Sequence, residues 1–207
     1  FVKRSLQFSV GNYFSNNLNQ APGYILPILV LHLLDAEAAA KFYLAATLGN
    51  LTMTIPFALS TSLLVEGSNQ EPLKKNFKKA LLATYISLIP CTIIVVLLGK
   101  DILGFFNPEY IEAYNLLVLV ALSRLIEALL VIYISVQNIR MKVKKVLQIN
   151  LYYFVLMLSL SYFLIQKFNI IGVGYAWLIS YSILLGIMLA EFWEMRSPEV
   201  KQQAKIP

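Results

Sequence analysis

A few polar and charged side chains inside long apolar segments have the chemistry to bind or move another molecule. Arg124 and Glu127 lie three positions apart, a spacing that places both on one helix face, close enough to pair. Asn12, Asn16 and Asn19 fall on one helical stripe, since each residue advances about 100° around a helix. Ionisable groups within an apolar segment are functional candidates by default, because burying a charge there is costly.

Each group has a structural and a functional interpretation. Amides between packed membrane helices form hydrogen bonds worth about 0.6 kcal/mol each, so the stripe could serve packing alone. A run of amides over three turns exceeds what one packing seam usually needs, which favours a water-filled lining. We expect Asn50 to face the same space from the next apolar segment. Arg124 and Glu127 either neutralise each other or take part in the function, and we favour function.

Composition excludes several classes of protein. The 207-residue chain has one cysteine and one histidine, too few for an internal disulfide or a multi-thiolate metal centre. We find no catalytic constellation and expect no covalent chemistry, no cofactor and no metal. The net charge of +6 would indicate nucleic acid in a soluble protein. Here the cations lie in loops that can face anionic lipid, so we expect membrane lipid as a partner and no nucleic acid.

The apolar content indicates a membrane protein. Hydrophobic residues make up 58% of the chain, charged residues 14%, and the mean hydropathy is +0.69. A soluble domain of this size cannot bury so much apolar surface, whereas lipid solvates the outside of a membrane bundle. Runs of roughly 20 apolar residues predict an all-α membrane protein, a bundle of six transmembrane helices. The predicted spans cover residues 6–34, 40–66, 77–98, 110–140, 146–168 and 171–193.

The positive charges predict an orientation for these six spans. With a cytoplasmic amino end, thirteen Lys and Arg residues fall on the cytoplasmic side and three on the other. We therefore expect a multi-pass plasma-membrane protein with both ends of this segment in the cytoplasm. Residue 1 is Phe and no cleavable signal peptide is visible, so we expect a fragment of a longer protein.

Two further patterns concern the last two spans. Polar residues of the fifth span align on one side, and the two tryptophans of the sixth lie toward its opposite ends. Tryptophans so placed fit interfacial anchoring, although simple packing is the alternative. The residues are Gln148, Tyr152, Ser159 and Gln166 in the fifth span, and Trp177 and Trp193 in the sixth.

Three stretches together resemble one known family: IPFALSTSLLVEGSN (55–69), FNPEYIEAYNLLVLVALS (106–123) and NIIGVGYAWLIS (169–180). They resemble the second half of oligosaccharide flippases, the polysaccharide-transport branch of the multidrug/oligosaccharidyl-lipid/polysaccharide exporter superfamily. Asn107 stands where the family turn has Gly. The resemblance implies one lobe of a MATE-like two-lobe transporter, whose N-terminal lobe we expect to be missing from this chain. It also implies that cavity cations hold the diphosphate of a polyprenyl-linked sugar, and Arg124 is the one candidate here.

The expected function is that of an integral membrane flippase component. It would translocate a lipid-linked oligosaccharide for cell-surface polysaccharide or glycan assembly by alternating access. The alternatives are a cation-coupled exporter of drugs or other small molecules with the same architecture, and a membrane scaffold that transports nothing. In the flippase, the sugar path would be lined by Asn12, Asn16, Asn19 and Asn50. Arg124 would attract phosphate, and Glu127 would partly neutralise the charge of Arg124 or couple transport to an ion.

Overall fold

The described chain is a bundle of long helices. The computed structural model describes residues 2–54, 57–59, 62 and 73–203, with side chains at 6, 8–54, 57–59, 62 and 76–190. These residues contain no strand, which confirms the predicted all-helical fold. Most of the stretch 55–69 and the side chain of Trp193 lie outside this description. The elements are α1 (Val2–Leu33), α2 (Ala36–Leu51), α4 (Leu73–Phe106), η1 (Pro108–Ala113), α5 (Tyr114–Ile139), α6 (Val143–Phe168) and α7 (Ile171–Gln203).

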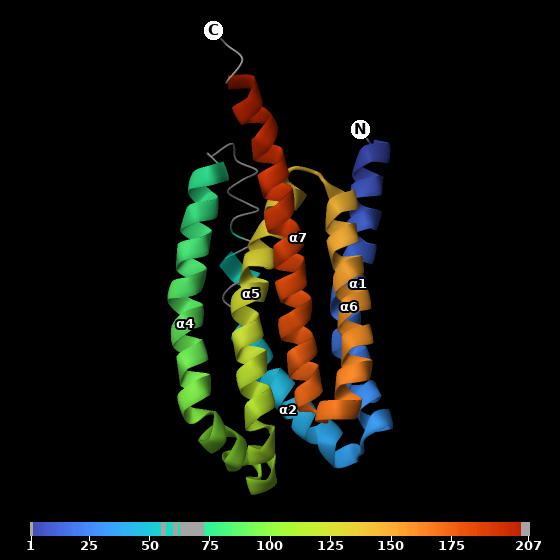
Figure 1. The fold of residues 1–207 in the computed structure, drawn as a ribbon, viewed down its shortest axis with the longest axis vertical. Coiled ribbons are helices and arrows are strands. Elements are labelled where there is room, and N and C mark those ends of the chain that lie inside the picture. The colour runs from blue at the N-terminus through green and yellow to red at the C-terminus, as the bar shows by residue number, and fades with distance from the viewer. Residues whose placement is uncertain (1, 55–56, 60–61, 63–72, 204–207) are drawn as a thin grey trace.

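Helix α5 occupies the centre of the bundle. It packs against α2, α4 and α7 and touches α6, whereas α1 packs against α6 and α2 (Figure 1). The buried face of α5 supplies fully buried aliphatic side chains, among them Leu116, Leu117 and Val120. Leu26 and Val30 of α1 belong to the same core cluster. Because α5 is surrounded, polar residues on its inner face meet other helices and not solvent.

Four helical segments among the described residues are long and apolar enough to cross a membrane, which is compatible with a multi-pass membrane protein. They are Asn76–Phe106, Pro108–Ile139, Val143–Phe168 and Ile171–Ala190. Helix α1 has 32 residues, but its amides lower its hydropathy, and α2 has only 16 residues before the chain turns. The predicted spans at 6–34 and 40–66, and with them the six-span MATE-like lobe, therefore remain predictions.

Local signals in the sequence set the ends of the helices. Asp35 caps α2, since its carboxylate accepts a hydrogen bond from the Ala38 amide at 2.7 Å. Asn107 does the same for η1, accepting from the Glu109 amide at 3.0 Å. The α5–α6 turn closes with a bond from the Lys142 amide to the carbonyl of Gln137. Such caps allow short connections, and these hold consecutive helices antiparallel (Figure 1).

Met141, in the α5–α6 turn, has a backbone geometry that glycine usually adopts. Its φ is 57°, and its amide donates to the Asn138 carbonyl at 2.9 Å. Together with the bond from Lys142 this is a Schellman motif, whose left-handed residue is most often Gly. The turn lies at the same end of the bundle as the N-terminus (Figure 1).

Candidate functional site

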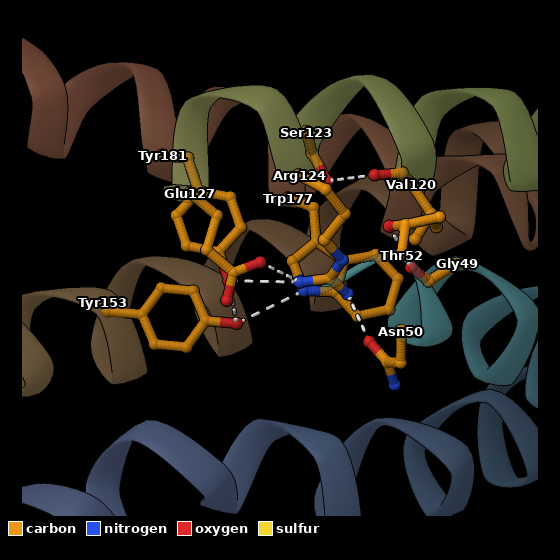
Figure 2. Close-up of polar contacts among 10 residues, drawn as sticks. All are labelled: Gly49, Asn50, Thr52, Val120, Ser123, Arg124, Glu127, Tyr153, Trp177 and Tyr181. Atoms are coloured by element: carbon orange, nitrogen blue, oxygen red, sulfur yellow. Dashed lines mark hydrogen bonds and ion pairs between the residues drawn. The ribbon is translucent and has the colours of Figure 1, made fainter. Parts of the chain in front are cut away.

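Arg124 and Glu127 form a buried ion pair in the middle of the bundle. Both extend from α5, and their exposed fractions are 4% and 8%. The guanidinium Nη1 donates to Oε2 of Glu127, and Nη2 donates to Oδ1 of Asn50 on α2 at 2.7 Å (Figure 2). A guanidinium keeps its proton in proteins, so burial requires compensation of its charge by a partner. Glu127 provides that compensation.

Aromatic side chains of α6 and α7 enclose the other side of the guanidinium. The Trp177 ring centroid lies 5.2 Å from the guanidinium carbon, a cation–π distance. The Tyr181 hydroxyl lies 3.4 Å from Nη1, and the Tyr181 ring stacks on Tyr153 with centroids 5.1 Å apart. The Trp177 indole donates to the Tyr153 hydroxyl at 3.2 Å. Nε of Arg124 has no partner among the described residues, so its N–H is an unused donor of the guanidinium.

The end of helix α2 brings Asn50 to this arginine. The helix ends at Leu51, and the Thr52 hydroxyl donates to the Gly49 carbonyl at 2.7 Å. A Cβ on Gly49 would lie 2.3 Å from Cγ1 of Val120, so only glycine permits so close an approach of α2 to α5. Asn50 is itself exposed, and Arg124 therefore lies one side chain below the surface. The partial negative charge at the carboxyl end of α2 also favours a cation.

A polar hollow lies along the exposed side of α1. Its volume is about 400 Å³, and it is open. Asn12 and Asn16 line it, and so does Asn17, which the predicted stripe omits. The Asn17 amide nitrogen donates to the Tyr13 carbonyl at 2.8 Å. The complete lining is Ser9, Asn12, Tyr13, Asn16, Asn17 and Gln20, and it contains no charged group.

Asn19 lies apart from this hollow, in the seam between α1 and α6. Its Nδ2 donates to Oδ1 of Asn150 at 3.3 Å. Nδ2 of Asn150 in turn donates to the carbonyl and the hydroxyl of Ser15, at 3.1 and 2.8 Å. Of the three asparagines of the predicted stripe, Asn19 thus has a packing role, because it lies at the edge of the stripe that is nearest Ser15 and faces α6.

The structure shows what the polar residues of the fifth predicted span face, and it corrects the interpretation of Trp177. The polar residues noted in α6, Gln148, Tyr152, Ser159 and Gln166, are exposed, and the buried face of α6 contains Asn150, Tyr153, Met157 and Ser161 instead. Trp177 is not an interfacial anchor, since it is 4% exposed and stacks on Phe42 with centroids 5.9 Å apart.

The structure brings together half of the predicted site residues. Asn50, Arg124 and Glu127 are in direct contact, whereas Asn12 and Asn16 share the hollow on α1. Sequence reasoning missed the aromatic enclosure. Trp177 and Tyr181 are four positions apart on α7, a spacing that indicates one shared face but not what that face meets. Among the described residues, no group of three or more His, Cys, Asp and Glu could hold a metal ion.

Comparisons of the chain with protein-family models, curated proteins and solved structures found no match. The class of this protein therefore rests on the described fold and site and not on any relative. In the part of the chain that the structure describes, the protein is all-helical, with four helices long and apolar enough to cross a membrane and with a buried arginine–glutamate pair.

Proposed function

We propose that this chain is one lobe of a membrane flippase that moves a lipid-linked oligosaccharide between leaflets by alternating access. The observation that carries the proposal is the position of Arg124, a buried cation separated from the bundle surface by the exposed Asn50. A membrane-buried arginine is costly, and such residues mark binding sites for anions or ion pathways. A phosphate-linked lipid is an anion that must pass through the membrane interior.

The ion pair gives the site a way to bind and release phosphate. While Glu127 holds Arg124, the pair has no net charge and the empty site is stable. An entering phosphate competes with the Glu127 carboxylate for the guanidinium and gains the unused Nε donor. Asn50 contacts the phosphate first because it lies on the exposed side of Arg124. The carboxylate then returns as the phosphate leaves, so no bond is made or broken.

The uncharged hollow on α1 supports a path for the sugar. Lipid does not solvate exposed amides, so this face requires water or another polar surface. A second lobe across a central cavity would provide both, and Asn12 and Asn16 then line the sugar path. Thr47 and Asn50 on α2 are exposed polar side chains as well. Rocking of the two lobes would open the cavity to each side in turn.

Glycan export by the full-length protein tests the proposal. We expect Asn12→Leu/Asn16→Leu to lower export strongly, because it removes two polar side chains of the hollow without touching the Asn19–Asn150 seam. Gln166→Leu is the matched control, since it replaces an exposed amide of α6 outside the hollow. Cell-surface polysaccharide is measured in a strain that depends on the introduced gene, at equal membrane abundance.

The ion pair provides the second variant for this assay. Arg124→Met/Glu127→Leu removes both charges together, so the bundle keeps an uncharged, filled interior. We expect this protein to reach the membrane and to export no glycan. Full export by this variant and by Asn12→Leu/Asn16→Leu would contradict the proposal and favour a membrane scaffold.

We further propose that both ends of the segment face the cytoplasm. The α5–α6 turn and the start of α4 lie at one end of the bundle, and η1 lies at the other (Figure 1). In a background lacking Cys91, cysteines at Lys78 and Lys144 are then expected to resist a membrane-impermeant reagent in intact cells. A cysteine at Asn107 is expected to react. The reverse pattern would overturn the orientation.

A cation-coupled exporter of small molecules is the second candidate function. The observation in its favour is the burial of the Glu127 carboxylate, since coupling carboxylates require a water-poor site. In that case Glu127→Gln abolishes drug resistance conferred by the protein, and no variant affects glycan export. Resistance without rescue of glycan export would establish this alternative over the flippase.

A further inference from the structure

A shallow groove between α5, α6 and α7 has a polar end and an apolar floor. Leu130 and Leu184, each 3% exposed, form the floor, and Ile187, 39% exposed, lies on the rim. At the polar end Lys145 lies over the Tyr133 ring, with its Nζ 6.0 Å from the centroid. Gln148 and Tyr152 also line the α6 side, so the charge lies at one end while the floor is apolar.

The length and position of the groove match part of a lipid. It extends along α6 from Lys145 to Tyr152, a rise of seven steps, or about 10 Å at 1.5 Å per residue. Its polar end is in the first turn of α6, and its apolar end is deeper in a helix able to cross a membrane. A headgroup at the first turn would place the start of an acyl chain on the Leu130–Leu184 floor.

The charge at the polar end selects the headgroup. The turn and the start of α6 have the sequence RMKVKK, four cations in residues 140–145 without an acidic residue. Arg140, Lys142 and Lys144 are exposed, and Lys145 lies at the groove itself. A surface-proximal Lys or Arg contributes about 1 kcal/mol of attraction to an anionic leaflet. Helix α6 has no side-chain cap, so the positive end of its dipole adds to this field.

We propose that this groove binds an anionic phospholipid of the surrounding bilayer, with the phosphate at Lys144 and Lys145 and one acyl chain lying on the protein surface over the groove floor. The site is separate from the Arg124 site and does not depend on the transport function proposed above. A zwitterionic lipid fits the floor equally well but gains no net attraction from the lysines, so headgroup charge decides between them.

Native mass spectrometry of the detergent-purified protein tests the site, with dioleoylphosphatidylglycerol as the anionic lipid and dioleoylphosphatidylcholine as the zwitterionic one. We expect the wild-type protein to bind the first phosphatidylglycerol at least 10-fold more tightly. Lys144→Gln/Lys145→Gln is expected to weaken that binding about 10- to 30-fold. The control Lys78→Gln/Lys79→Gln makes the same charge change at the start of α4 and is expected to leave binding unchanged.

A second pair of variants tests the acyl-chain floor. Ile187→Trp fills the groove and is expected to weaken binding of both lipids, whereas Ile183→Trp, at a neighbouring exposed position of α7 outside the groove, is expected to leave it unchanged. Equal affinity of the wild-type protein for both lipids would overturn the proposal, and so would an equal loss in the Lys78/Lys79 control. Unchanged binding by Ile187→Trp would also overturn it.

A third ligand identifies the lipid class. A polyisoprenyl phosphate that displaces phosphatidylglycerol at lower concentration would show that the groove takes the transported kind of lipid, and would overturn assignment to a bilayer phospholipid. The wild-type measurements need no substitution, and Lys144→Gln/Lys145→Gln changes one exposed and one half-buried side chain outside the core. Both therefore decide the question even if Ile187→Trp fails to fold.

Discussion

Replacing Glu127 with Leu would leave the Arg124 guanidinium buried without a compensating charge. Arg124 is 4% exposed, and its remaining contacts would be one neutral hydrogen bond to Asn50, one long contact to the Tyr181 hydroxyl, and the Trp177 ring. None of these three partner groups carries a full negative charge. The guanidinium also cannot lose its proton to escape the cost of burial.

The expected magnitude follows from the burial of the pair. Removing one partner of a buried ion pair costs about 3–5 kcal/mol, and at about 2–4 °C per kcal/mol this lowers the Tm by roughly 6–20 °C. Arg124→Met is expected to cost less, because the Glu127 carboxylate left behind can take up a proton and become neutral. Arg124→Met/Glu127→Leu is expected to lie within about 1 kcal/mol of the wild-type protein or to be more stable, since apolar groups of similar size replace both charges.

Thermal unfolding of the four proteins in one detergent, followed by far-UV circular dichroism, completes this double-mutant cycle. The expected order of stability places the double variant near the wild-type protein, Arg124→Met below it, and Glu127→Leu lowest. A double variant as unstable as Glu127→Leu would refute the reasoning, because it would show that packing and not charge compensation sets the cost. A Glu127→Leu protein as stable as the wild type would mean that water already solvates Arg124.

Three further predictions concern packing and turns, each measured as the shift in Tm in the same detergent. Met141→Gly is expected to stabilise the protein by about 1 kcal/mol, since it removes the cost of a left-handed residue at φ 57°; a loss would contradict this. Gly172→Ala should destabilise by about 1–3 kcal/mol, because its Cβ would lie 2.3 Å from a backbone carbonyl oxygen of α6. Gly186→Ala, which meets nothing within 4 Å, is its control and should be neutral or stabilising. Asn150→Leu should cost about 2 kcal/mol, because three hydrogen bonds are lost, two of them to Ser15; an unchanged Tm would show that the α1–α6 seam is hydrated.

The all-helical fold could be predicted from the sequence alone, because its signals are local. Apolar runs of sufficient length predict helices, and the Asp35 and Asn107 caps mark where two of them begin. The Arg124–Glu127 pair was also predictable, since three positions on a helix fix the proximity of two side chains whatever surrounds them.

Tertiary structure alone decided what meets each helix face. Asn50 and Arg124 are 74 positions apart, and Tyr181 and Arg124 are 57 apart, so only the packing of α2, α5 and α7 brings them together. The helical periodicity likewise predicted that Asn19 belongs to a polar stripe. It did not predict that Asn19 pairs with Asn150, which is 131 positions away. A helical period fixes the angle between side chains on one helix but not the rotation of that helix against its neighbours. That rotation is set by close packing contacts, such as the contact of Gly49 on α2 with Val120 on α5, and no local sequence pattern predicts such contacts.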